Sequence, residues 1–207
     1  EILLGLHHKH GLLDSFLGSF AQSILKGTHR QMMVVKCLMP VNTMRRLMVA
    51  VPPKAEFEAG FYKWVERLAR IGGQLGCRVH FWAHPDTILR INGYLKKFHG
   101  NVRVEFSPMD DWDDLLLMSS KVAYDHLVVI VSARKGAISY QSSFEELPTQ
   151  ITKYFSNCSL MLIYPDQLGD PLENLTFSSP RGQSENPIYD HVSKWVYKWM
   201  KKGEEQG

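Results

Sequence analysis

Two stretches of the sequence combine residue types that suit the binding of an anion. The first consists of Gly5, His8, Gly11 and the pair Gly18-Ser19. Glycines at a strand end let the backbone approach a phosphate, and a helix N-terminus offers it free N–H groups. The second consists of Arg134, Lys135, Gly136, Ser142 and Ser143. A guanidinium, an ammonium and small hydroxyl donors suit a small anion, although two solvated loop cations would give the same pattern.

Several other chemistries are excluded by motifs that the sequence lacks. It has no Gly-x-x-x-x-Gly-Lys-Ser/Thr phosphate loop, no Gly-x-Gly-x-x-Gly after a first strand and no Gly-x-Ser-x-Gly hydrolase elbow. Its three cysteines lack metal-ligand spacing, and His80 and His84 flank a predicted strand, where packing explains them. The net charge of +3 is too small for a nucleic-acid-binding surface. We therefore expect no catalysis, no metal site and no nucleic-acid partner.

The elements that position these residues alternate regularly along the chain. Apolar runs predict strands at Ile2–Leu6, Met32–Met39, Arg46–Val51, Arg78–Ala83, Asn101–Phe106, His126–Val131 and Leu160–Tyr164. Helical periodicity fills most of the intervals, including residues 14–27, residues 57–75, a helix that begins after Asp86, one that begins near Asp110, and one around residues 148–155. This order predicts an α/β fold with a parallel sheet and helices on both faces. The most apolar strand, His126–Val131, is expected at its centre.

The organisation of the chain follows from the same alternation. Residues 45–165 make a complete five-stranded unit, and residues 1–44 match only the last part of such a unit. We expect Met32–Met39 to belong to a second sheet. Residues 166–186 are a polar linker. Residues 187–207 are an amphipathic helix and tail, which we expect to pack on this chain or on a dimer partner, with docking to another protein as the alternative.

The first glycine loop resembles the signature of universal stress proteins, in which glycines and a Gly-Ser/Thr pair hold ATP phosphates. Gly5, Gly18 and Ser19 match that signature, and His8 stands where the family has a second glycine. The resemblance implies ATP or another nucleotide as the ligand of the first unit. In the complete unit, Pro52 follows the first strand where the family has an acidic residue, and no Gly-Ser pair follows Gly136. For that unit the resemblance implies the fold without ATP binding. Universal-stress folds usually join through their last strands, so the resemblance also implies that Met32–Met39 and Leu160–Tyr164 pair or pack across a pseudo-twofold axis, within one chain or between chains.

A second resemblance concerns the end of the complete unit. Residues 127–140, 144–148 and 160–165 resemble the cytosolic tail of Bacteroidetes-type monovalent cation:proton antiporters, in which tandem universal-stress-like units follow a transporter. It implies a non-catalytic regulatory domain on the cytoplasmic side of the inner membrane. Its partners would be the transmembrane part of the same protein and a homodimer or pseudodimer mate that pairs through the last strands. A stand-alone tandem universal stress protein that binds ATP is the alternative, and an enzyme of the related nucleotide-binding group is a third hypothesis.

Overall fold

A computed structural model describes residues 1–5 and 18–168. Seven strands form one sheet in the order β1-β2-β7-β6-β3-β4-β5. The strands are β1 (Ile2–Gly5), β2 (Met32–Lys36), β3 (Arg46–Ala50), β4 (Arg78–Ala83), β5 (Val104–Pro108), β6 (His126–Val131) and β7 (Ser159–Tyr164). The helices are α1 (Gly18–Gly27), α2 (Phe61–Leu75), α3 (Pro85–Phe98), α4 (Leu115–Ser119) and α5 (Leu147–Tyr154). In this part of the chain no helix is both long and apolar enough to cross a membrane.

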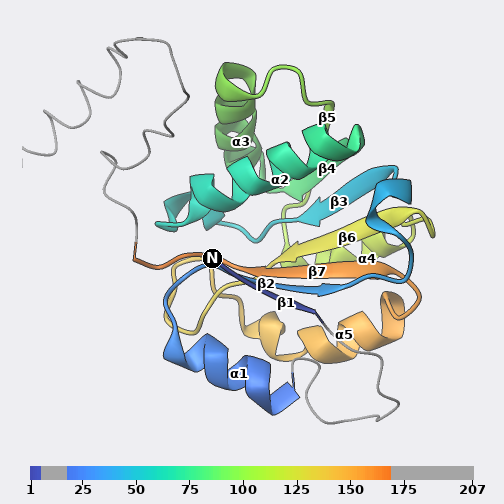
Figure 1. The fold of residues 1–207 in the computed structure, drawn as a ribbon. Helices are drawn as coiled ribbons and strands as arrows, with labels where there is room; N and C mark the ends of the chain where they lie inside the picture. The colour runs from blue at the N-terminus through green and yellow to red at the C-terminus, as the bar shows by residue number, and fades with distance from the viewer. Residues whose placement is uncertain (6–17, 169–207) are drawn as a thin grey trace, which may run out of the picture. The chain divides into compact units, whose positions relative to one another are not determined.

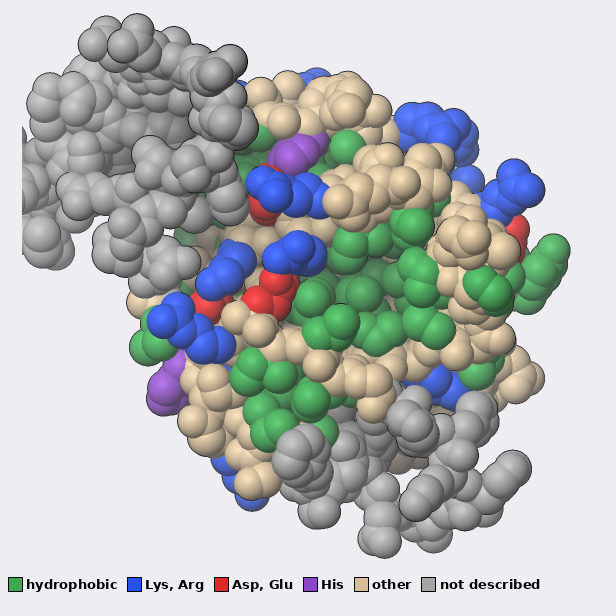
Figure 2. All heavy atoms as spheres, viewed as in Figure 1, with side chains coloured by type: hydrophobic (Ala, Val, Ile, Leu, Met, Phe, Trp, Pro, Cys, Tyr) green, Lys and Arg blue, Asp and Glu red, His purple; other side chains and the backbone are tan. Residues whose placement is uncertain are grey.

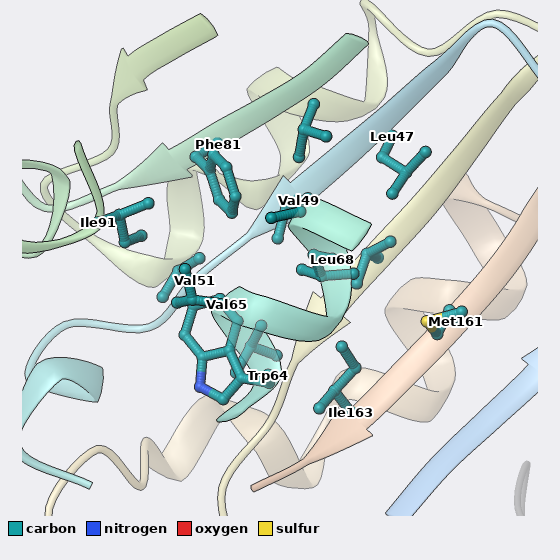
Figure 3. Close-up of a cluster of buried hydrophobic side chains, with 14 of the residues drawn as sticks. Leu47, Val49, Val51, Trp64, Val65, Leu68, Phe81, Ile91, Met161 and Ile163 are labelled. Atoms are coloured by element: carbon teal, nitrogen blue, oxygen red, sulfur yellow. The ribbon is translucent and has the colours of Figure 1, made fainter. Parts of the chain in front are cut away.

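Helices cover both faces of the sheet, as the alternation predicted (Figure 1). Helices α2 and α3 lie on one face, and α1, α4 and α5 lie on the other. Figure 3 shows the packing of α2 on the sheet, where Trp64 and Leu68 of α2 pack against Val49 of β3. Each fully buried side chain of this size contributes roughly 1.5–3 kcal/mol to folding. Two helices begin later than expected: α2 begins at Phe61 instead of residue 57, and α4 begins at Leu115 instead of near Asp110.

The five strands of residues 45–165 are parallel neighbours in the order β7-β6-β3-β4-β5. They do not form a sheet of their own, because β2 continues the same sheet beyond β7. The prediction that Met32–Met39 belongs to a second sheet is therefore wrong. An edge of β7 that lacked a partner would leave backbone N–H and C=O groups unpaired, and β2 satisfies them. Strand β6 is the fourth of the seven strands, but among the five strands of residues 45–165 it is the second and β3 is the central one, so the predicted central position of β6 in that unit is wrong.

The junction between β2 and β7 is antiparallel, and it relates two similar parts of the chain. Val34 of β2 faces Leu162 of β7. On the outer sides, Leu4 of β1 pairs with Val34, and Ile130 of β6 pairs with Leu162, both in parallel. Helices α1 and α5 lie on the same face, as an axis normal to the sheet requires (Figure 1). The segment β1–α1–β2 thus repeats β6–α5–β7, and the expected pairing of these two last strands is present.

Other predictions fall outside the described residues. They include His8, Gly11, most of the linker at 166–186 and the amphipathic helix with its tail at 187–207.

Candidate functional site

The topology places the candidate site of the complete unit between β3 and β6. The chain order of the strands reverses there, and the loops after these two strands, residues 51–60 and 132–146, flank the reversal. Ligands of open α/β sheets bind at this position, beyond the carboxyl ends of the strands. The predicted residues Arg134, Lys135, Gly136, Ser142 and Ser143 all belong to the second loop.

Arg134 joins the two repeats. Its Nη1 donates to the carbonyl of Leu25 at 2.6 Å, and its Nη2 donates to the carbonyl of Arg30 at 2.8 Å. These carbonyls lie in the last turn of α1 and just before β2. Burial lowers the pKa of Arg134, and Tyr164 and Asp166 oppose that effect. The guanidinium therefore holds α1 and β2 against the loop after β6.

Lys135 points to a different partner. Its Nζ lies 2.8 Å from Oε1 of Glu145, and both side chains are exposed. Gly136 follows with a φ of 89°, the left-handed region that glycine adopts without strain. Ser142 and Ser143 begin the 3₁₀ turn η4 (Ser142–Glu145). The structure thus brings the predicted residues into one loop but directs the two cations to separate partners, so anion binding here stays a prediction.

Sequence reasoning missed a carboxylate that reaches the loop after β6. Oε1 of Glu58, from the loop after β3, accepts hydrogen bonds from the Ser139 N–H at 3.1 Å and from the Ser139 hydroxyl at 2.8 Å. Ser139 is buried. A backbone N–H and a hydroxyl that converge on one oxygen are the donors that a phosphate oxygen would use. A side-chain oxygen of the chain itself takes that place.

A second contact closes the loop after β3 onto the end of β7. Nζ of Lys63, near the start of α2, lies 2.7 Å from Oδ2 of the buried Asp166. Burial alone would raise the pKa of Asp166, but Lys63 and the Leu168 N–H outweigh it and lower that pKa. Gly60 packs so tightly that a Cβ there would lie 2.5 Å from the Asp166 nitrogen. Asp166, expected to open the linker, is therefore part of the folded unit.

The first predicted loop follows β1, and it begins at the opposite end of the strands from Arg134. Gly5 is the last residue of β1, and β1 runs antiparallel to β6, which precedes Arg134. Gly18 and Ser19 are the first two residues of α1. With His8 and Gly11 outside the described ranges, the geometry of this loop stays a prediction.

Comparisons add no assignment to this geometry. The sequence matches no protein-family model, and a search of curated proteins finds no relative. Within residues 1–5 and 18–168, no three or more histidine, cysteine, aspartate or glutamate side chains are grouped so that they could hold a metal ion.

Proposed function

We propose that this chain is a non-catalytic regulatory domain of a monovalent cation:proton antiporter, built from the end of one universal-stress-like unit and a complete second one. The observation that carries the proposal is the antiparallel pairing of β2 with β7, which joins two repeats through their last strands. The parallel order β7-β6-β3-β4-β5 agrees with the resemblance to universal stress proteins. The antiporter itself is supported by the sequence resemblance of residues 127–140, 144–148 and 160–165.

The contacts at the switch point favour a scaffold over a nucleotide-binding unit. A phosphate that reached Ser139 would have to displace the Glu58 carboxylate, and both groups are anionic. The Arg134 guanidinium is held by two backbone carbonyls. Each of these contacts would be lost on ligand binding, and burial would make their loss costly.

The outer edge of β1 favours a larger tandem assembly. The repeat makes Leu3 equivalent to Val129, which is fully buried beside β3 and α2. Leu3 is 65% exposed, and among the described strands β1 pairs only with β2. Figure 2 shows hydrophobic side chains gathered near these strands, beside α2. A strand and helix that completed the first unit would cover Leu3 as β3 and α2 cover Val129.

Calorimetry with Mg-ATP on the 207-residue chain tests whether the complete unit acts as a scaffold that binds no nucleotide. We expect no saturable heat that depends on Arg134 and Lys135, the two cations of the complete unit. Tight binding that is abolished by changing both Arg134 and Lys135 to alanine would support the ATP-binding stand-alone protein instead. Glu58→Ala is the informative companion variant, because weak binding of inorganic phosphate by this variant alone would show that the carboxylate blocks the loop.

The antiporter assignment has its own test. The reading frame that encodes this chain should also encode membrane-spanning segments, and their absence would exclude the assignment. In membrane vesicles that contain the whole protein, Val34→Pro removes an N–H from the β2–β7 junction. We expect this variant to change the pH or ion dependence of transport at an unchanged amount of protein. The exposed-surface variant Leu89→Gln is the control.

A further inference from the structure

The sheet face that carries α4 and α5 has a polar end, where β3, β4 and β6 begin. Arg46 of β3 is in register with Arg78 of β4 on one side and with His126 of β6 on the other. His80 of β4 is in register with Glu105 of β5. These five residues are the polar row of the following paragraphs. Helix α4 is only five residues long, and the turn of residues 120–125 that follows it leads into β6.

One carboxylate serves both guanidinium groups of this row. Glu105 accepts from Nη1 of Arg46 at 2.8 Å and from Nη1 of Arg78 at 2.6 Å. Nδ1 of His80 lies 3.4 Å from Nη1 of Arg46, and Nε2 of His80 lies 2.9 Å from the Ser107 hydroxyl. Since a guanidinium only donates, the His80 ring fits this site as a neutral imidazole with an unprotonated Nδ1.

The turn of residues 120–125 contacts the sheet at His126 and next to His80, and the Arg45 N–H also donates to the carbonyl of Asp125 at 2.9 Å. The Ala123 N–H donates to Nδ1 of His126 at 3.1 Å, so Nδ1 must be unprotonated here as well. Nζ of Lys121 lies 4.7 Å from the centre of the Trp82 ring, and that ring packs against His80 at a centroid distance of 5.2 Å. The turn therefore depends on one neutral imidazole directly and places a cation beside the other.

We propose that His80 and His126 form a proton-responsive pair, which holds the turn of residues 120–125 on the sheet when both rings are neutral and releases it when they are protonated. A proton on Nδ1 of His126 removes the acceptor of the Ala123 N–H. A proton on His80 places a third cation beside Arg46 and Lys121. Two carboxylates face the pair and oppose the response. Oε2 of Glu105, already shared by two guanidinium groups, lies 3.7 Å from Nδ1 of His80, and Oδ1 of Asp125 lies 3.7 Å from Nε2 of His126.

Electrostatics set the direction of this response. Burial lowers the pKa of His80, Arg46, Lys121 and His126 lower it further, and Glu105 opposes them. Burial also lowers the pKa of His126, with Arg46 acting in the same direction and Asp125 against it. A histidine whose pKa is lower in the folded chain stabilises the fold at neutral pH, and this contribution is lost as the pH falls below the ordinary value of 6.5. Acidification therefore loosens the turn.

The test is amide hydrogen exchange of the whole chain at neutral and mildly acidic pH, corrected for the intrinsic pH dependence of exchange. We expect protection of residues 121–126 to fall about fivefold to tenfold on acidification relative to residues 128–130 of β6, as loss of one hydrogen bond implies. The double variant His80→Gln, His126→Asn should abolish this dependence. Its amide groups match the Nε2 donor and the Nδ1 acceptor but do not titrate in this range.

His29→Gln is the matched control, because His29 is exposed, hydrogen bonds to Gln167 and lies beyond the opposite edge of the sheet. It should leave the response unchanged. Proton NMR titration of the two imidazoles gives a second readout, with midpoints below that of a free histidine. A response that persists in the double variant, or equal protection of the turn at both pH values, would overturn the proposal.

Discussion

Gly60→Ala tests whether the loop after β3 is held against the end of β7. Gly60 precedes α2 with a φ of −86°, a backbone conformation that any residue can adopt. Glycine is required there only because there is no room for a Cβ. An added Cβ would lie 2.5 Å from the nitrogen, 2.6 Å from the oxygen and 3.0 Å from the Cα of Asp166. These are backbone atoms, which cannot turn aside as a flexible side chain does.

The size of the effect follows from this geometry. To accommodate the methyl group, the loop must move away from Asp166, which strains the ion pair between Lys63 and Asp166. Overpacking of this kind costs about 1–3 kcal/mol. The matched control is Gly93→Ala in the middle of α3, where a Cβ would meet nothing within 4 Å. Alanine should stabilise that helix by about 1 kcal/mol, since glycine is the weaker helix former.

Urea unfolding of both variants and of the native chain gives the measurement. We expect the free energies of unfolding of the two variants to differ by about 2–4 kcal/mol, with the native chain between them. The midpoints of thermal unfolding should shift in the same direction, by about 2–4 °C for each kcal/mol of change in the free energy of unfolding. If Gly60→Ala were as stable as the native chain while Gly93→Ala gained stability, the close contact with Asp166 would not exist.

Three further predictions concern other parts of the fold. Burial alone would raise the pKa of Glu66, but hydrogen bonds from three neighbours, the first of them from His99, lower it. Glu66→Gln should therefore lower the free energy of unfolding by about 2 kcal/mol at neutral pH, measured by urea unfolding. This loss should shrink as the pH falls below the ordinary carboxyl pKa of 4.5. Burial raises the pKa of Tyr164 to about 12, so Tyr164→Phe should leave the tyrosinate absorbance near pH 10 unchanged, and a decrease would contradict its burial. Leu3→Ser should change the stability of this chain by less than about 0.5 kcal/mol, as for other exposed positions, whereas in a longer protein with a complete first unit the same change should be clearly destabilising.

The general architecture was accessible from the sequence because it depends on local patterns. An apolar run such as His126–Val131 suits a strand buried on both faces, and the structure buries residues 127–131 of that strand. Gly76 ends α2 in the left-handed conformation, with a φ of 63°, as a glycine at a helix end predicts. Helix bounds were less accurate: Phe57 fits the apolar spacing of α2, yet it lies outside the helix and is exposed.

The pairing of β2 was only partly accessible. The run Met32–Val35 is apolar on both sides, which fits an interior strand of any sheet. Whether β2 joins the same sheet or a second one depends on which strands are left at a sheet edge after folding. Residue types do not determine that. The expected pairing with β7 came from the resemblance, whereas the assignment to a separate sheet came from treating each unit as closed.

The contacts of the candidate site were not accessible for a different reason. Glu58 and Ser139 lie 81 positions apart, so no spacing rule joins them. Arg134 binds backbone carbonyls, which every residue carries and which leave no trace in the side-chain pattern. Sequence reasoning predicted a site in this loop, and the structure brings the predicted residues into it. The partners of Arg134, however, depend on the antiparallel junction, which brings α1 beside the loop after β6.

The loop after β6 therefore connects three parts of the fold. Through Arg134 it holds the carbonyls at the end of α1 and before β2, and through Ser139 it holds Glu58 of the loop after β3. In an open α/β sheet, ligands bind beside this loop, at the carboxyl ends of the strands. Here Arg134 ties the two repeats together, and Ser139 ties the two loops of the complete unit to each other. These contacts are compatible with the proposed scaffold, since they hold the loop after β6 by groups of the chain itself.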